Sequence, residues 1–247
     1  MRNIKLTIEY DGTAFQGWQV QPGNRRTVQG VIEKALHKIF KQKIRLIGSG
    51  RTDSGVHARG QVANFKISSD MPCDEIVRAL NANIPEDVAI LEAREVADDF
   101  HAQYSVKSKT YRYTILNRPA RSALDRYTSL HYFHKLNVSV MKEEAKALIG
   151  KKDFKSFTAS DPSKKQDNTT RTVKSIVIKK SKDGVTVDIT ADGFLYKMVR
   201  NIIGTLLAVG SGQLLKGSVK LILKKKDRSF AHDTAKAHGL CLMKVEY

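Results

Sequence analysis

Hydrophobic and polar residues alternate along several short stretches, and this alternation predicts β-strands. In residues 4–10 (IKLTIEY) every second residue is apolar, which is the period of a half-buried strand. From Thr27 to Lys41 the apolar residues recur at helical spacing, with Thr27 as the expected N-cap. Further along, the pattern predicts a strand at 43–48, a strand at 60–67, a short helix near 73–81 and a strand at 87–96. The first hundred residues therefore predict the order βαββαβ.

The second part of the chain repeats this order. The predicted elements are strand 108–117, helix 138–149, strand 171–180, strand 184–191, helix 195–209, an added helix near 216–225 and a last strand near 240–246. Residues 161–170 carry turn-forming and charged residues without periodicity, so we expect a loop there. The simplest fold class for this pattern is α+β, with two ferredoxin-like domains in a pseudo-twofold relation, at 1–103 and 104–247.

Charge changes this picture by pointing to a partner. The 247 residues hold 43 Lys and Arg against 25 Asp and Glu, a net charge of +18 that exceeds what solubility requires. Residues 1–100 hold 14 basic and 13 acidic side chains, whereas residues 101–247 hold 29 and 12. A polyanion is the expected partner, and nucleic acid contact should depend mainly on the second half. Three lysine clusters are candidate phosphate contacts: Lys164–Lys165, Lys179–Lys180 and Lys224–Lys226.

Other classes of protein fit less well. No stretch approaches the roughly twenty apolar residues of a membrane span, and the first ten residues alternate rather than form a signal peptide, so we expect a cytoplasmic protein. Cys73 and Cys241 lack the paired spacing of a zinc or redox motif. We therefore expect no disulfide and no metal.

The segment GSGRTDSGVHA, residues 48–58, places Asp53 inside a glycine-rich loop. Its glycines do not have the spacing of a dinucleotide-binding loop, and no Lys-Ser or Lys-Thr follows as in a phosphate-binding loop. An ordinary Asp-Ser-Gly turn is the commonest explanation of such a segment. Arg51 and His57 flank the carboxylate, however, and a carboxylate kept ionised by a neighbouring cation is a usable nucleophile.

At these residues the chain resembles the TruA family of tRNA pseudouridine synthases over nearly its whole length. The segments that carry the resemblance are YDGTAFQGWQVQ (10–21), GRTDSGVHARGQV (50–62), KTYRY (109–113), DFKSF (153–157), RTV (171–173), GFLYKMVRNIIGTL (193–206) and HGLCLMKVEY (238–247). Two departures are visible: Lys152 stands where the family usually has His, and Lys236 stands where Pro is common.

The resemblance implies a reaction and its residues. Members of the family isomerise uridine to pseudouridine at positions 38, 39 and 40 of the tRNA anticodon stem-loop. Their catalytic aspartate maps onto Asp53, which would either attack C1′ of the ribose or abstract the C2′ proton. Tyr111 maps onto the active-site tyrosine that stacks on the flipped base, and Arg200 maps onto the cationic partner of the aspartate. Arg51 could share that role or hold RNA backbone.

The sequence thus predicts a cofactor-independent isomerase with a basic cleft between its two domains, and the resemblance implies a homodimer. Phe15 and Trp18 of the N-terminal motif are expected to pack rather than to stack on RNA. Two alternatives stay open. One is a tRNA-binding or tRNA-folding module without catalysis, and the other is a paralogue that modifies different RNA uridines.

Overall fold

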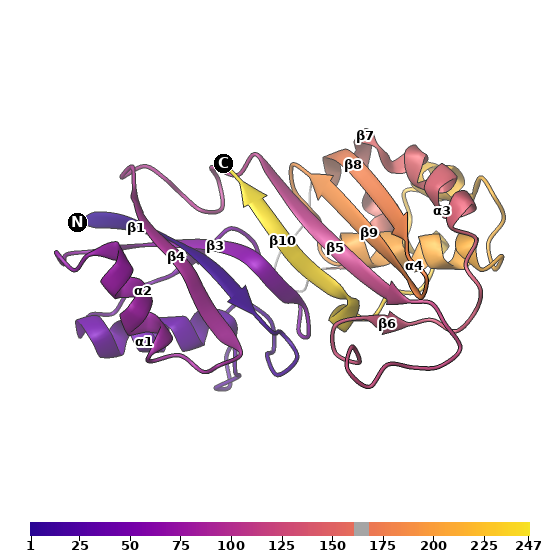
Figure 1. Cartoon of the computed structure of the whole chain (residues 1–247). Helices are drawn as coiled ribbons and strands as arrows, with labels where there is room; N and C mark the ends of the chain where they lie inside the picture. The colour runs from indigo at the N-terminus through magenta and orange to yellow at the C-terminus, as the bar shows by residue number, and fades with distance from the viewer. Residues whose placement is uncertain (161–167) are drawn as a thin grey trace. The chain divides into compact units, whose positions relative to one another are not determined.

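The computed structural model describes residues 1–160 and 168–247, so most of the loop predicted at 161–170, with Lys164 and Lys165, lies outside the described residues. The chain forms two compact units: residues 1–107 together with 241–247, and residues 108–240. Figure 1 follows the chain from indigo at the N-terminus to yellow at the C-terminus. Within the described ranges no helix is long and apolar enough to cross a membrane. Both units combine helices with β-sheet, so the predicted α+β class is confirmed.

The first unit is built around a β-sheet with two helices. Its elements are β1 (Arg2–Tyr10), α1 (Val28–Phe40), β2 (Ile47–Gly48), β3 (His57–Ile67), α2 (Cys73–Asn81), β4 (Val88–Val96) and β10 (Leu240–Glu246), whose residues from Cys241 on belong to this unit. The strand order is β4-β1-β3, with all pairs antiparallel, and β2 also pairs antiparallel with β3. Strand β10 pairs in parallel with β3 through Cys241 and Leu242. The last strand of the chain therefore lies beside the strand that follows the Asp53 loop.

Local chemistry explains where these elements begin and end. The Thr27 hydroxyl accepts a hydrogen bond from the Gly30 N–H at 3.3 Å, which confirms the predicted N-cap of α1. The strand predicted at 43–48 is wrong in extent, because only Ile47 and Gly48 are in β2. Two side chains of α1 form hydrogen bonds with the backbone of Leu46. Glu33 accepts from its N–H at 2.9 Å, and Gln29 donates to its C=O at 3.1 Å. These bonds replace a β-ladder at that residue.

In the second unit the strands pair in the order β5-β9-β8-β7, with the short β6 parallel to β5. Its elements are β5 (Ser108–Leu116), β6 (Leu130–His131), α3 (Val138–Ala145), η1 (Lys146–Leu148), β7 (Gly150–Asp153), η2 (Lys155–Phe157), β8 (Thr170–Lys180), β9 (Gly184–Ala191), α4 (Met198–Gly210), α5 (Ser218–Lys225), η3 (Arg228–Phe230) and η4 (Ala237–Gly239). The predicted helix 138–149 is α3 followed by a 3-10 turn, and β7, whose sequence GKKD has no apolar alternation, was not predicted.

The two faces of β5 differ sharply. Tyr111, Tyr113 and Ile115 are buried on one face, as the alternation predicted. On the other face Arg112 forms a bidentate ion pair with Asp188 of β9, with N–O distances of 2.7 and 2.8 Å. Such a cross-strand pair fixes the register of β5 against β9. The buried face of β5 is thus held in place by polar contacts on its opposite face.

Helix α4 is buried on every side rather than along one apolar stripe. Every one of its thirteen residues is fully buried except Arg200. A helix that is buried all round belongs to the interior of its unit, so the amphipathic helix predicted at 195–209 is wrong in this respect. It also begins later than predicted, at Met198, because Lys197 has left-handed backbone angles, with φ 57°.

Candidate active site

Asp53 lies in the loop between β2 and β3, with its side chain half-buried. Its neighbours in the loop differ in exposure: Arg51 is exposed, whereas Thr52 and His57 are buried. The Asp53 carbonyl accepts a hydrogen bond from the Val56 N–H at 3.2 Å, which closes a tight turn. The loop is therefore a turn, as its composition suggests, but one that is anchored in the core of its unit.

The N-terminal segment 10–18 holds this loop through Thr52 and Ser54. The Trp18 N–H donates to the Thr52 carbonyl at 3.1 Å, and the Ser54 hydroxyl donates to the Phe15 carbonyl at 3.0 Å. Phe15 and Trp18 are only 1 and 2% exposed, so the prediction that they pack is confirmed. The residues on both sides of Asp53 thus have fixed backbone partners.

A buried side-chain contact adds to these backbone bonds. The Tyr10 hydroxyl lies 2.8 Å from the Thr52 hydroxyl, and both residues are buried. Burial raises the pKa of Tyr10 above its ordinary value, against the smaller opposing effect of its hydrogen bonds. Tyr10 therefore stays neutral and keeps its hydroxyl hydrogen in this contact.

Two glycines allow the segment to approach so closely. A Cβ on Gly17 would lie 2.7 Å from the Thr52 carbonyl oxygen, and its φ of +94° is one that other residues rarely adopt. A Cβ on Gly12 would lie 2.0 Å from the Val56 carbonyl oxygen. Any larger residue at either position has to displace the backbone next to Asp53.

His57 joins the same two segments at the other end of the loop. The Gly12 N–H lies 3.1 Å from His57 Nδ1, and Asp11 Oδ1 lies 3.0 Å from the same nitrogen. Since a backbone N–H can only donate, a ring without a hydrogen on Nδ1 accepts from Gly12, whereas a ring with a hydrogen on Nδ1 donates to Asp11. Burial acts to raise the pKa of Asp11, but hydrogen bonds from Thr13 and the nearby His57 outweigh it, so the pKa lies below its usual value.

In the second unit, Tyr111 of β5 is 7% exposed. The Phe194 ring meets it edge-on, with centroids 5.1 Å apart and planes at 90°. This T-shaped contact fixes the plane of the Tyr111 ring. Tyr111 is therefore packed as expected of a tyrosine in a sheet, and Phe194, which precedes α4, sets the orientation of its ring.

Arg200 lies at the one position of α4 that is not fully buried, and its Nε donates to the Ala235 carbonyl at 2.8 Å. Burial raises the pKa of the neighbouring Tyr113, and the charge of Arg200 acts in the opposite direction. The Tyr113 hydroxyl donates to the Lys236 carbonyl at 2.8 Å. Lys236 has φ −59°, an angle that proline also adopts, so the departure from the family pattern keeps the local conformation.

Lys109 is a candidate that the sequence analysis did not single out. It lies on β5 two residues before Tyr111, on the same face of the strand. Burial lowers the pKa of its ammonium group from 10.5 to about 8. The signal in the sequence was a lysine at an inward position of an alternating strand.

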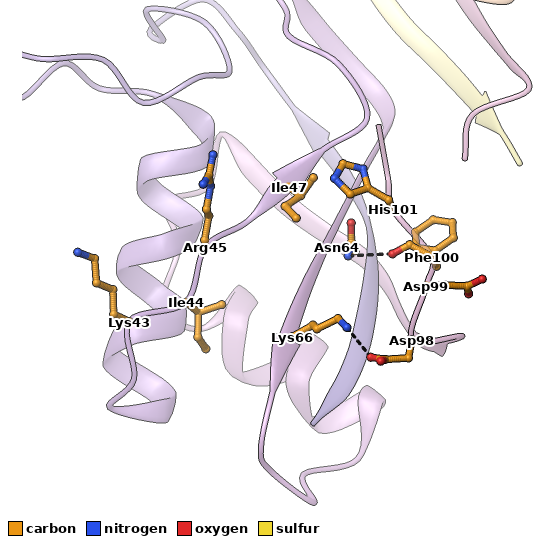
Figure 2. Close-up of a pocket in the computed structure, with 10 residues that line it drawn as sticks. All are labelled: Lys43, Ile44, Arg45, Ile47, Asn64, Lys66, Asp98, Asp99, Phe100 and His101. Atoms are coloured by element: carbon orange, nitrogen blue, oxygen red, sulfur yellow. Dashed lines mark hydrogen bonds and ion pairs between the residues drawn. The ribbon is translucent and has the colours of Figure 1, made fainter. Parts of the chain in front are cut away.

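A pocket of about 370 Å³ in the first unit lies apart from these residues. Neither Arg51 nor Asp53 lines it, and its charged lining residues include Lys43, Arg45, Lys66, Asp98 and Asp99. Figure 2 shows Lys66 pointing toward Asp98, 2.6 Å away, and Lys43 pointing away from that pair. In the described part of the chain no three His, Cys, Asp or Glu side chains are grouped so that they could hold a metal ion.

The structure places the predicted site residues in both units. Arg51 and Asp53 lie in the loop between β2 and β3 of the first unit. Tyr111 lies on β5 and Arg200 on α4, both in the second unit. Within the second unit Tyr113 connects the two elements, because it lies on the Tyr111 face of β5 and within electrostatic range of Arg200.

Comparison with known proteins gives a consistent result. The family model described as tRNA pseudouridine synthase matches residues 6–105 and 145–247. Similar relatives include tRNA pseudouridine synthase A of Thermoanaerobacter sp. (strain X514), 46% identical over 247 residues, and tRNA pseudouridine synthase A 2 of Clostridium perfringens (strain 13 / Type A), 46% identical over 248 residues. Both alignments cover 100% of each chain. A solved Cbf5-Nop10-Gar1 complex is 12% identical, with 96% of this chain and 57% of that chain covered, and its TM-score of 0.34 is too low to establish a shared fold.

Proposed function

Because the chain belongs to the tRNA pseudouridine synthase family, whose members convert uridine to pseudouridine, we propose that it carries out this isomerisation on tRNA with Asp53 as its nucleophile. The observation that supports this role is the clamp around Asp53. The Trp18 N–H holds the Thr52 carbonyl and the Ser54 hydroxyl binds the Phe15 carbonyl, so that the half-buried carboxylate between Thr52 and Ser54 is presented from a fixed loop. A structural turn does not need this many long-range contacts, whereas a nucleophile gains from a fixed position.

The chemistry needs a single carboxylate. The N1–C1′ bond breaks, the uracil turns, and C5 bonds to C1′ while the C5 proton is lost and N1 gains one, so no water is consumed. Asp53 takes part either by attacking C1′ or by removing the C2′ proton, and both routes need the ionised carboxylate. One aspartate therefore suffices where hydrolysis of a glycoside requires two carboxyl groups.

The other site residues take supporting roles in this proposal. Tyr111 offers its ring to the uridine that has left the stack, and Arg200 is the proposed cationic partner of Asp53. Arg51, which is exposed beside Asp53, contacts the RNA backbone. The proposal requires that residues of the two compact units act on one uridine.

The proposed substrate is the anticodon stem-loop, with uridines 38, 39 and 40 as targets, and the proposed enzyme is a homodimer. The test is to incubate tRNA transcripts with the purified protein and to map pseudouridine by carbodiimide modification and primer extension. Stops at these three positions support the proposal. Stops elsewhere identify a paralogue with other targets, and tight binding without any stop identifies a binding module.

A further inference from the structure

The segment from Asn117 to Lys135, here called the 117–135 loop, stands apart from the rest of the second unit. It lies between the two stretches that the family model matches, residues 6–105 and 145–247. Its 19 residues hold four Lys and Arg against a single Asp, together with three aromatic side chains. Loops of this length without much regular structure usually have a function of their own.

Hydrogen bonds at its base give this loop a defined shape. The Asn117 side-chain amide donates to the Tyr132 and His134 carbonyls, both at 2.8 Å, and His131 Nε2 donates to the Arg118 carbonyl at 2.9 Å. These bonds bring the start and the end of the loop together, so the Tyr132–His134 stretch lies beside Asn117.

The single acidic residue of the loop is engaged in a turn. The Asp125 carboxylate accepts from the Ser122 hydroxyl at 2.9 Å, and its carbonyl accepts from the hydroxyl of the buried Ser129 at 3.0 Å. Arg118 is also engaged, because it lies 3.3 Å from Asp183 of the turn before β9. The exposed charges of Arg121, Arg126 and Lys135 remain without a matching acid inside the loop.

The loop is ordered, yet it leaves its apolar groups in solvent. Leu124 is 92% exposed, Phe133 is 64% exposed and Tyr127 is 48% exposed. The Arg126 guanidinium lies 4.4 Å from the Tyr127 ring centroid, and the His134 ring lies 3.9 Å from the Phe133 ring. Because none of these groups builds the core, stability does not explain their presence.

We propose that the 117–135 loop binds an unpaired stretch of the RNA substrate, with Tyr127 and Phe133 stacking on bases and Arg121, Arg126 and Lys135 meeting phosphates. Exposed rings next to cations are the usual platform for single-stranded nucleic acid. Charge argues against a second copy of this chain as the occupant, since two such loops would each bring the same excess of positive charge. The inference rests on the proposed function, but it concerns binding rather than chemistry.

The test compares the RNA affinity of variants that lose the aromatic rings of the loop with that of variants that keep them. Affinities of the full chain are measured by fluorescence anisotropy for an oligouridylate of about ten nucleotides, for an RNA duplex of the same length and for a tRNA transcript. The double variant Tyr127→Leu/Phe133→Leu should bind oligouridylate at least about tenfold more weakly and the duplex almost unchanged. Tyr127→Phe keeps a ring and should bind like the parent. Phe230→Leu removes a 50% exposed ring next to Lys225 elsewhere in the unit, and should also bind like the parent.

Charge gives a second, independent readout. Arg121→Gln and Arg126→Gln should each reduce the salt dependence of oligouridylate binding by about 0.7 in log–log slope. Equal losses for duplex and oligouridylate, or unchanged affinity in all ring variants, would overturn the inference. The inference would also be overturned if the double ring variant sedimented as a monomer while its RNA affinity per protomer stayed unchanged. The loop would then join two copies of the chain. The proposed function can fail separately from this inference. In that case the parent would form no pseudouridine, while the affinity differences between the ring variants would still be seen.

Discussion

The Asp53 loop and the 117–135 loop are both anchored by hydrogen bonds, but they expose opposite kinds of surface. Around Asp53, buried groups such as Tyr10 and Thr52 close the loop on the core and leave a single carboxylate half-exposed. In the 117–135 loop the bonds lie at the base, and rings and cations remain in solvent. The difference indicates that the first loop is built for position, whereas the second is built for accessible area.

The largest effect should come from breaking the clamp with Gly17→Ala. The added Cβ meets the Thr52 carbonyl at 2.7 Å, and the φ of +94° adds strain, so the backbone next to Asp53 has to move. We expect kcat to fall by about a hundredfold or more. The control is Gly23→Ala, where φ is +83° but nothing lies within 4 Å of the new Cβ. Equal kcat in both variants would show that the clamp does not position the nucleophile.

The next effect concerns Lys109, which lies on β5 between the two loops in the chain. Its pKa of about 8 in the folded protein lies below the 10.5 of the unfolded chain. Between these values the unfolded state binds more protons, so the free energy of unfolding should rise with pH from 8 to 10.5. Lys109→Met should lack this rise, which amounts to about 1.4 kcal/mol for each pH unit between the two pKa values. Parallel pH profiles in urea unfolding would contradict the burial of this ammonium group.

A smaller effect should come from the buried hydroxyl pair of the clamp. Tyr10→Phe and Thr52→Val each leave one hydroxyl without its partner at 2.8 Å and should each cost about 1 kcal/mol of unfolding free energy. The double variant should cost less than the sum of the two, since the contact between the two hydroxyls can be lost only once. Additive losses in urea titrations would mean that the two hydroxyls do not interact.

The smallest effect should come from loosening the base of the 117–135 loop. Asn117→Ala removes two hydrogen bonds from a half-buried side chain and should cost at most about 1 kcal/mol of stability. If the two loops have separate tasks, this variant should raise KM for tRNA severalfold more than it lowers kcat. A fall in kcat alone would instead connect the loop to the chemical step.

Much of the fold could be predicted because it follows from local patterns. The alternation in β1 and β5 and the N-cap at Thr27 have the predicted consequences. The predictions were wrong where contacts with residues outside the local segment determine the extent of a strand or the burial of a helix. Glu33 and Gln29 of α1 take the backbone bonds of Leu46 and shorten the strand before Asp53, and the central place of α4 buries it on all sides.

The candidate site shows the same division. The resemblance implied roles for Asp53, Tyr111 and Arg200, and the loop's own residues made Arg51 a candidate, while composition alone favoured an ordinary turn around Asp53. The clamp was not predictable, because its bonds join residues more than thirty positions apart, such as the Trp18 N–H and the Thr52 carbonyl. Lys109 was overlooked because an inward lysine in a strand acquires its perturbed pKa only when the unit packs around it.

The central claim, that Asp53 is the nucleophile of a uridine isomerase, can be tested by tritium release from tRNA labelled at uracil C5, with no metal or nucleotide added. The matched control for Asp53→Asn is Asp98→Asn, which removes a carboxylate that is paired with Lys66 at the surface of the same unit. We predict release by the parent and by Asp98→Asn, none by Asp53→Asn, and tRNA affinities within a few-fold of one another. Normal release by Asp53→Asn would contradict the claim.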